Sequence, residues 1–243
     1  MREPVDAELD ELISIAAAGG SPDADRSFLQ FVRDHGRLLV ADAGGAPAGF
    51  AGAIPIGDVL MVTDLFVDVG HRGRGIGGSL LGAVLRGAAR RMTFSSTHPA
   101  ALAAYTTAGM ALRCKLLTMR RERGGDATSV QPMLDEDWRH ERPELVAYFR
   151  SRGAHVSRDH VVMVETYRSV VLRALGDPYE AVLIRALAEL PRDRPVDVSV
   201  GEHHPCGPWL RSCGFEVIDH DLFFAGPGIE LPPAGPLLHR GLA

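Results

Sequence analysis

A glycine-rich stretch with two arginines stands between an apolar run and a helical pattern. The stretch GHRGRGIGG, residues 70–78, follows LMVTDLFVDV and precedes leucines and valines at helical spacing. Glycines let backbone N–H groups approach a ligand, because no Cβ is in the way. The N-terminus of the following helix adds unpaired N–H groups and the positive end of its dipole. Since a turn without a ligand needs only two or three glycines, the sequence predicts a phosphate-binding loop.

Two kinds of phosphate loop fit the glycine spacing. Gly73, Gly75 and Gly78 satisfy G-x-G-x-x-G, the pattern of dinucleotide-binding folds. Those folds also need an acidic residue about twenty residues further on, which binds the ribose hydroxyls. No acidic residue occurs between Asp68 and Glu122, whereas arginines and a lysine recur throughout that interval. The sequence therefore excludes a dinucleotide and favours a ligand with several phosphates, such as coenzyme A.

The second pattern is R-x-x-G-x-G, which Arg72, Gly75 and Gly77 satisfy, and with it the chain resembles the GNAT acyltransferase superfamily. The family order of strand, loop, helix, strand, short helix with a tyrosine and strand is met from residue 1 to about 123. The segments are LMVTDLFVDV, GGSLLGAVLRGAARR, MTFSST, HPAALAAYTTAGM and ALRCKLLTMRR. The resemblance implies an α/β (α+β) fold with a mixed, mostly antiparallel sheet flanked by helices. It also implies acetyl transfer from acetyl-CoA to a primary amine by direct attack.

The resemblance implies where coenzyme A would bind. Backbone N–H groups of the strand before the loop would polarise the thioester carbonyl and bind the pantetheine arm, and the loop and helix start would bind the phosphates. The residues expected to contact the coenzyme are Leu65, Phe66, Val67, Arg72, Gly73, Arg74, Gly75, Ile76, Gly77, Gly78, Ser79 and His98.

Three side chains are candidates for catalysis. Transfer to an amine needs a neutral nucleophile, a donor for the oxyanion and a proton for the leaving thiolate. Tyr105, with an ordinary pKa of about 10, stands four residues before Gly109 as in the family; it is the expected acid, and the alternative is a packed tyrosine. Asp64 is a candidate base, directly or through water, although some GNAT enzymes that act on diamines have Glu-Asp where this chain has Thr63-Asp64. The alternative is a carboxylate that binds only backbone or solvent.

His98 is the third candidate, at a position where the family often has asparagine. A histidine titrates near neutrality and suits the role of a base. A hydrogen bond to the pantetheine arm explains it equally well.

The elements that must position these groups are visible upstream. An apolar stripe at helical spacing runs from Val5 to Ala16, and a second helix is expected to begin near Asp25. The segments RLLVAD and APAGFAGAIPI are expected strands, joined by AGGA at hairpin spacing. The sequence therefore predicts two helices and an antiparallel meander that leads into the glycine loop.

The second half of the chain repeats the first in a degenerate form. ERGGDATSVQ, residues 122–131, is polar and is expected to be a linker, which gives domains 1–125 and 126–243. VVLRALG, PYEAVLIRALAEL, VDVSV, HPCGPWLRSCGF and EVIDHDLFF repeat the order strand, helix, strand, short helix, strand. The glycine loop is reduced to GDPYE, residues 176–180, and Leu210 replaces Tyr105. We expect a GNAT-like half without coenzyme A, the alternative being an unrelated α/β cap.

Composition excludes several classes of protein. The 243 residues carry a net charge of −5, contain three cysteines and have no apolar run long enough for a membrane span. The acidic N-terminus is not a secretory signal. His203, His204, Cys206 and Cys213 match no common zinc spacing. We expect a cytoplasmic monomer or homodimer without metal, nucleic acid or membrane as partners.

The sequence leaves two functions open. The first is an acetyl-CoA-dependent N-acetyltransferase that acts on a small-molecule or peptide amine. The second is an inactive acyl-CoA-binding sensor or interaction module, because both need the glycine loop. Tyr105 and Asp64 favour the enzyme.

Overall fold

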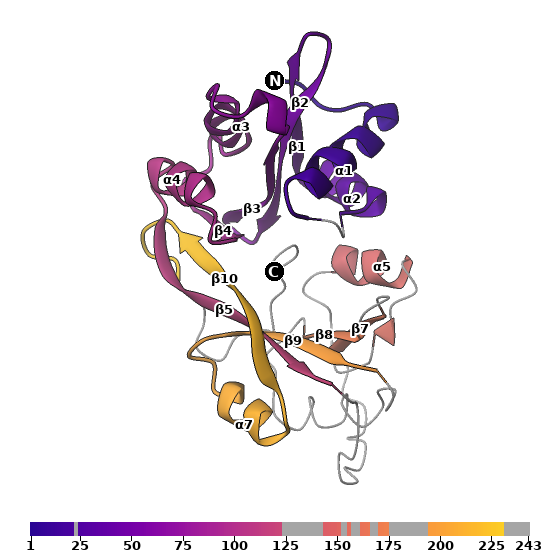
Figure 1. Ribbon diagram of the computed structural model, residues 1–243, viewed down its shortest axis with the longest axis vertical. Coiled ribbons are helices and arrows are strands. Elements are labelled where there is room, and N and C mark those ends of the chain that lie inside the picture. The colour runs from indigo at the N-terminus through magenta and orange to yellow at the C-terminus, as the bar shows by residue number, and fades with distance from the viewer. Residues whose placement is uncertain are drawn as a thin grey trace. The chain divides into compact units, whose positions relative to one another are not determined.

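The chain forms two compact units. The computed structural model describes residues 1–21, 24–122, 143–151, 155–156, 161–165, 170–174 and 194–230. The first unit consists of Met1–Arg113 and Leu222–Glu230, and the second of Cys114–Asp221 (Figure 1). Both contain a sheet with helices, as the expected mixed α/β fold requires.

The first unit has a meander of three antiparallel strands followed by a parallel one. Its strand order is β1-β2-β3-β4, and the end of β10 pairs with β4. The elements are η1 Asp6–Glu8, α1 Leu9–Ala18, α2 Arg26–His35, β1 Arg37–Ala43, β2 Ala46–Ile56, β3 Val59–Val67, η2 Val69–His71, α3 Ile76–Val84, β4 Arg91–Ser95 and α4 Pro99–Thr107.

Local signals account for the first half of this unit. The Asp25 side chain accepts a hydrogen bond from the Phe28 N–H at 2.9 Å, so α2 begins where its cap residue predicts. Gly44 and Gly45 both have positive φ, 64° and 89°, which a two-residue hairpin between β1 and β2 needs. These two predictions are confirmed.

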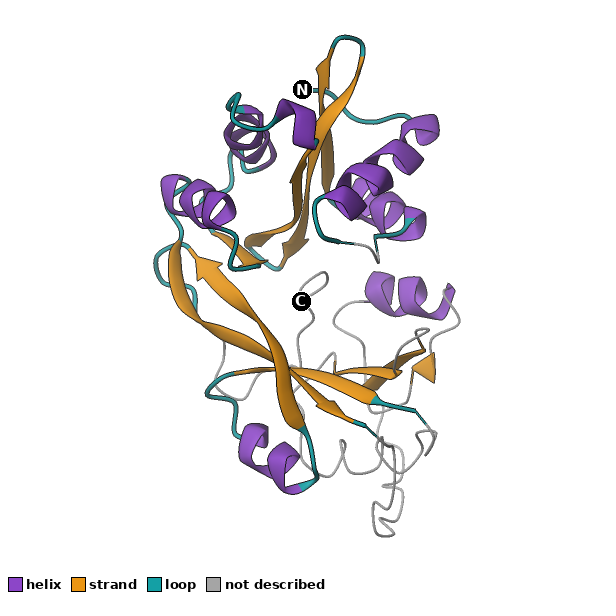
Figure 2. Ribbon diagram, viewed as in Figure 1, coloured by secondary structure: helices purple, strands orange, loops and turns teal. Residues whose placement is uncertain are grey.

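The core of the first unit lies on both faces of its sheet. In Figure 2, α1 and α2 cover one face, and α3 and α4 cover the other. Leu80, Leu81 and Val84 of α3 are buried together with Tyr105 of α4 and Phe224 of β10. The apolar stripe predicted for α3 is therefore its buried face.

Helix α3 is shorter than its sequence pattern suggests. The pattern extends to Arg91, but the helix ends at Val84 and Arg91 opens β4. Arg37 donates through Nη1 to the carbonyl oxygens of Val84 and Arg86, at 2.8 and 2.7 Å, and so satisfies the end of the helix. Gly87, with φ at 78°, turns the chain away.

The second unit repeats the strand sequence of the first. Its order is β10-β5-β9-β8-β7-β6, where β10 contributes Glu216–Asp221. The elements are β5 Ala111–Arg121, α5 Pro143–Ser151, β6 His155–Val156, β7 Val161–Glu165, β8 Val170–Ala174, β9 Val196–Gly201, α7 Cys206–Ser212 and β10 Glu216–Ala225. The expected helix at 178–190, the GDPYE segment and the expected linker after Glu122 lie outside the described residues.

The expected boundary at residues 125/126 differs from the division in the structure. β5 enters the second unit at Cys114 and pairs there with β9, from Leu116↔Gly201 to Arg121↔Val196. The end of β10 pairs in turn with β4 of the first unit, Leu222↔Ser95 to Ala225↔Met92. Each half of the sequence thus supplies one strand to the other unit, which a boundary drawn at a polar linker does not foresee.

Candidate active site

The glycine loop lies between the end of β3 and the start of α3. Gly73 and Gly75 both have φ at 77°, a left-handed conformation that favours glycine. Gly75 is the N-cap of α3 and has no side chain, so the first-turn N–H groups of the helix receive no side-chain cap. A Cβ added at Gly73, Gly75 or Gly78 would have no atom within 4 Å. The loop thus offers open space and free donors, as an anion needs.

Charged side chains around the loop favour an anion. The negative charge of Asp68 is engaged by its neighbours in the loop. Its carboxylate accepts a hydrogen bond from the Gly70 N–H at 3.0 Å and lies 2.8 Å from Nδ1 of His71. The interaction with His71 lowers the pKa of Asp68. Arg72 donates through Nε to the Val67 carbonyl at 3.1 Å, and Arg74 is exposed. Within the described residues neither arginine forms an ion pair, so both positive charges remain available.

Strand β3 has backbone groups on one side without a strand partner. β4 pairs with β3 only over Leu60–Val62, while β3 continues to Val67 and pairs with β2 up to Gly49↔Val67. Beyond Thr93, the partner of β4 is β10. In the described part of the chain, the backbone of 63–67 therefore faces no strand on the β4 side. Leu65, Phe66 and Val67, where the pantetheine arm was expected, lie in this segment.

A β-bulge buries Asp64 next to this open edge. Gly52 pairs with Asp64 and Ala53 with Val62, so Thr63 is the extra residue. A Cβ at Gly52 would stand 2.6 Å from Oγ1 of Thr63 and 3.0 Å from Oδ2 of Asp64, so both side chains lie over this glycine. Asp64 is 8% exposed and its Oδ2 has no hydrogen-bond partner. Burial raises the pKa of Asp64 to about 6.

Tyr105 is a second buried polar residue, on the α3–α4 face of the sheet, whereas Asp64 lies on the α1–α2 face. Tyr105 is 5% exposed, and burial raises its pKa to about 12. The hydroxyl interacts with the side chain of Thr93, and the charge of Asp64 also raises its pKa. Thr93 donates through Oγ1 to the Val62 carbonyl at 3.0 Å, which fixes it beside β3. We call the three buried polar residues on the two faces of this part of the sheet, Asp64, Thr93 and Tyr105, the polar cluster.

The sequence analysis missed Thr93. The signal for it was weak, because Thr93 and Ser95 alternate with apolar residues in β4 as polar residues do in many half-buried strands. Both are in fact buried. The pairing of Thr93 with Val62 places it on the α3–α4 face with Tyr105, whereas the bulge at Thr63 leaves Asp64 on the other face, over Gly52 and beside Val32 of α2.

His98, the third candidate for catalysis, is not part of the polar cluster. It is exposed and is the N-cap of α4, where its Nδ1 accepts from the Ala100 N–H at 3.3 Å. His204 makes the same interaction in the second unit, with the Cys206 N–H at 3.1 Å. The shared geometry indicates a helix cap, which leaves Nε2 of His98 for a ligand.

The second unit has an apolar residue at the position of Thr93. β8 pairs with β9 over Val170–Leu172, as β3 pairs with β4 over Leu60–Val62, so Val198 corresponds to Thr93. β8 has no bulge like the one at Thr63, so Arg173, which follows Leu172 and pairs with Val162, stands in the register of Asp64.

The short helices give the third correspondence. The Met110 N–H donates to the Tyr105 carbonyl at 3.1 Å, as the Phe215 N–H does to the Leu210 carbonyl at 3.0 Å. The intervening glycines, Gly109 and Gly214, have φ at 79° and 83°. Leu210 thus stands at the position of Tyr105, as the sequence predicts.

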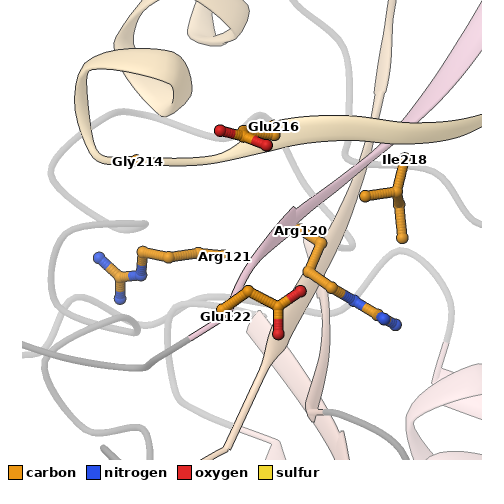
Figure 3. Close-up of a pocket in the computed structure, with 6 residues that line it drawn as sticks. All are labelled: Arg120, Arg121, Glu122, Gly214, Glu216 and Ile218. Carbon is orange, nitrogen blue, oxygen red and sulfur yellow. The ribbon is translucent and has the colours of Figure 1, made fainter.

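A pocket in the second unit carries mixed charges. Its volume is about 370 Å³, and Figure 3 shows Arg120 and Arg121 pointing in opposite directions. Arg120 pairs with Asp197 through Nε at 2.7 Å and Nη2 at 2.9 Å. Glu122 and Glu216 add two carboxylates. Among the described residues, Nε and Nη2 of Arg121 have no hydrogen-bond partner, but the pocket has no glycine-rich loop at a helix N-terminus like that of the first unit.

Metal and membrane sites were sought in the described segments. There, no three His, Cys, Asp or Glu side chains gather closely enough to hold a metal ion. None of the described helices is long and apolar enough to cross a membrane.

The segment that contains the glycine loop, β3 and the polar cluster is similar in sequence to a known family. Residues 7–110 match the acetyltransferase (GNAT) family. This range ends just beyond α4 and so contains the glycine loop and the polar cluster. No curated protein is similar to the chain in sequence.

Solved structures with a similar fold cover most or all of the chain. A protein of Pyrococcus horikoshii described as a candidate acetyltransferase has a TM-score of 0.75 at 16% identity, covering 100% of this chain and 95% of that one. A GCN5-related N-acetyltransferase from Sphaerobacter thermophilus has a TM-score of 0.60 at 17% identity, covering 95% and 96%. A tandem GNAT protein from the clavulanic acid biosynthesis pathway reaches 0.58 at 15%, covering 91% and 94%. The expected fold class is confirmed.

Proposed function

We propose that the first unit transfers an acetyl group from acetyl-CoA to an amine, and that the second unit binds no coenzyme. The observation that carries this proposal is the juxtaposition of three features in the GNAT-matching segment. The backbone of 63–67 without a strand partner on the β4 side, the open glycine loop and the polar cluster all lie along β3 or at its end. A structural role alone does not account for the uncapped start of α3 or for Oδ2 of Asp64, which has no hydrogen-bond partner among the described residues.

The residues of the loop fit a coenzyme with several phosphates. The first-turn N–H groups of α3 and the charges of Arg72 and Arg74 would bind the phosphates, and the free edge of β3 at Leu65–Val67 would bind the pantetheine amides. Acetyl-CoA supplies an acetyl group activated as a thioester. The open positions at Gly73, Gly75 and Gly78 leave room for such a ligand beside the backbone.

The polar cluster supplies proton transfer. A carboxylate with a pKa of about 6 is mostly ionised at neutral pH and is matched to accept a proton from an amine. A phenol with a pKa of about 12 keeps its proton and can give it to a departing thiolate. In the balanced reaction a C–N bond forms and a C–S bond breaks. The nitrogen loses one proton to Asp64, and the sulfur gains one from Tyr105.

Release of free thiol, measured against a panel of amines, tests the proposal. The panel consists of polyamines, aminoglycosides, amino-acid derivatives and lysine peptides, each with acetyl-CoA, and binding of coenzyme A is measured by calorimetry in parallel. We expect thiol release that depends on at least one class of amine. Neither binding nor release would contradict the proposal.

The near-complete burial of Tyr105 and Asp64 supports a second candidate, an acyl-CoA-binding sensor. A site that never meets an amine needs no exposed acid or base. Tight coenzyme binding without release with any amine would establish the sensor. The same pair of measurements therefore separates the two functions.

A further inference from the structure

We propose that Phe224 of the C-terminal strand is a positioning residue for Tyr105, so that the last strand of the chain completes the site of the first unit. This inference rests on the proposed function, in which Tyr105 gives a proton. Phe224 lies more than one hundred residues after Tyr105 in the sequence, beyond the segment that matches the GNAT family.

The strand register places Phe224 at the polar cluster. Phe224 of β10 pairs directly with Thr93 of β4, and residues directly opposite in an antiparallel pair point to the same face. Tyr105 meets both of them. Its hydroxyl interacts with Thr93, and its ring centroid is 6.0 Å from that of Phe224, with the planes at 43°. The two neighbours in the sheet therefore hold the two ends of the tyrosine side chain.

Helix α4 offers little else that could fix the tyrosine. Its sequence is PAALAAYTT, and Tyr105 is its single buried residue. Small alanines leave the helix free to shift unless the one large buried ring is held. Phe224 is 4% exposed and belongs to the same core cluster, so it supplies that contact.

The second unit is consistent with this role. There, Met119 of β5 pairs with Val198, so methionine occupies the position of Phe224. The aromatic pair is absent where leucine replaces the tyrosine. The aromatic contact is thus found in the unit that has the candidate acid, Tyr105, and not at the corresponding position of the unit that lacks it.

Two neighbouring phenylalanines allow a matched test. Phe223 is 0% exposed and points to the other face of the sheet, with its ring 5.2 Å from Phe94. Phe224→Leu and Phe223→Leu should therefore lower thermal stability similarly. Only Phe224→Leu should lower kcat, by about tenfold, while KM for acetyl-CoA stays unchanged. A 1 Å misplacement of a catalytic group costs roughly 10²-fold in rate, and we expect a smaller displacement here.

A second readout needs no activity. The full chain is labelled with 3-fluorotyrosine, and the ¹⁹F NMR signal of Tyr105 among the four tyrosines is assigned with Tyr105→Phe. Asp64 is the charged group that acts on this phenol. In Phe224→Leu the Tyr105 signal should shift and its titration should move to lower pH, because water reaches the ring; in Phe223→Leu both should remain.

The two readouts separate this inference from the proposed function. A moved Tyr105 titration in a protein without transferase activity would support the positioning role and contradict the proposed function. Equal effects of the two variants, or an unchanged Tyr105 signal in Phe224→Leu, would overturn the inference.

Discussion

The two units keep the same framework and differ at the polar cluster. Each short helix follows a histidine whose Nδ1 accepts from the N–H two residues on, and each is followed by a glycine with positive φ. Thr93 and Tyr105 of the first unit correspond to Val198 and Leu210 of the second. The features that the fold requires are thus present twice, whereas the buried polar side chains are present once.

This difference teaches what the polar cluster is for. Burying a polar group without full hydrogen bonding costs free energy, and an apolar replacement of similar shape avoids the cost. The second unit shows that the framework accepts apolar residues at the positions of Thr93 and Tyr105. The fold therefore does not require polar residues there, which supports the proposed chemical role of Tyr105.

The largest effect should come from removing the proton of Tyr105. Tyr105→Phe keeps the ring and its contact with Phe224, so coenzyme affinity should hold while the chemical step slows by about 10²–10⁴-fold. Single-turnover rates across pH measure this. Tyr148→Phe, at a buried tyrosine of α5 in the second unit, is the control and should leave the rate unchanged. Equal rates for wild type and Tyr105→Phe would make Tyr105 a packing residue.

Asp64 should make the protein less stable as pH rises. Its pKa is raised from 3.8 to about 6, so the folded state binds its proton more tightly and stability is lost between these values. Asp64→Asn does not titrate there. Relative to wild type, it should therefore gain about 2 kcal/mol in free energy of unfolding as pH rises from 4 to 7, at about 1.36 kcal/mol per pKa unit, while losing activity.

Urea unfolding at several pH values measures the difference. Asp68→Asn gives a control of opposite sign, because the pKa of Asp68 is lowered and its contribution is lost as pH falls. A pH-independent difference between wild type and Asp64→Asn would show that Asp64 is not desolvated.

A substitution in the glycine loop should have a smaller effect, and a second glycine of α3 serves as its control. Gly78 and Gly82 both lie in α3, one turn apart, and a Cβ at either position meets no atom within 4 Å. Leucine at either should stabilise the helix by roughly 0.5–1 kcal/mol. Only Gly78→Leu fills the space at the N-terminus, because helical side chains point in that direction.

We therefore expect both variants to melt at higher temperature, and only Gly78→Leu to bind coenzyme A at least about tenfold more weakly. Calorimetry decides between them. Equal affinity of the two variants would place the coenzyme elsewhere.

Local signals made much of the fold predictable. Asp25 caps α2, Gly44 and Gly45 form the hairpin, and the order of strand, glycine loop and helix is as expected, because each depends on residues close in sequence. The end of α3 was not predictable, since the cap comes from Arg37, far upstream. The strand exchange was not predictable either, because β5 and β10 have similar patterns and only tertiary pairing decides their neighbours.

The candidate site was also predictable only where the information lies in residues close together in the sequence. Tyr105 and Asp64 follow from the family pattern, but the faces of the sheet on which they lie depend on the bulge at Thr63 and on the register of β3 with β4. Thr93 and Phe224 join them only through pairings of β4 with strands on either side. Periodicity within one strand carries no information about such pairings.

The number of acetyl-CoA molecules bound per chain tests the central claim most directly. Titration calorimetry of the full chain with acetyl-CoA should give a stoichiometry of one, and Gly78→Leu should weaken this binding while Gly82→Leu leaves it intact. Two equivalent molecules per chain, or one that survives Gly78→Leu unchanged, would contradict the account in which only the first unit holds the coenzyme.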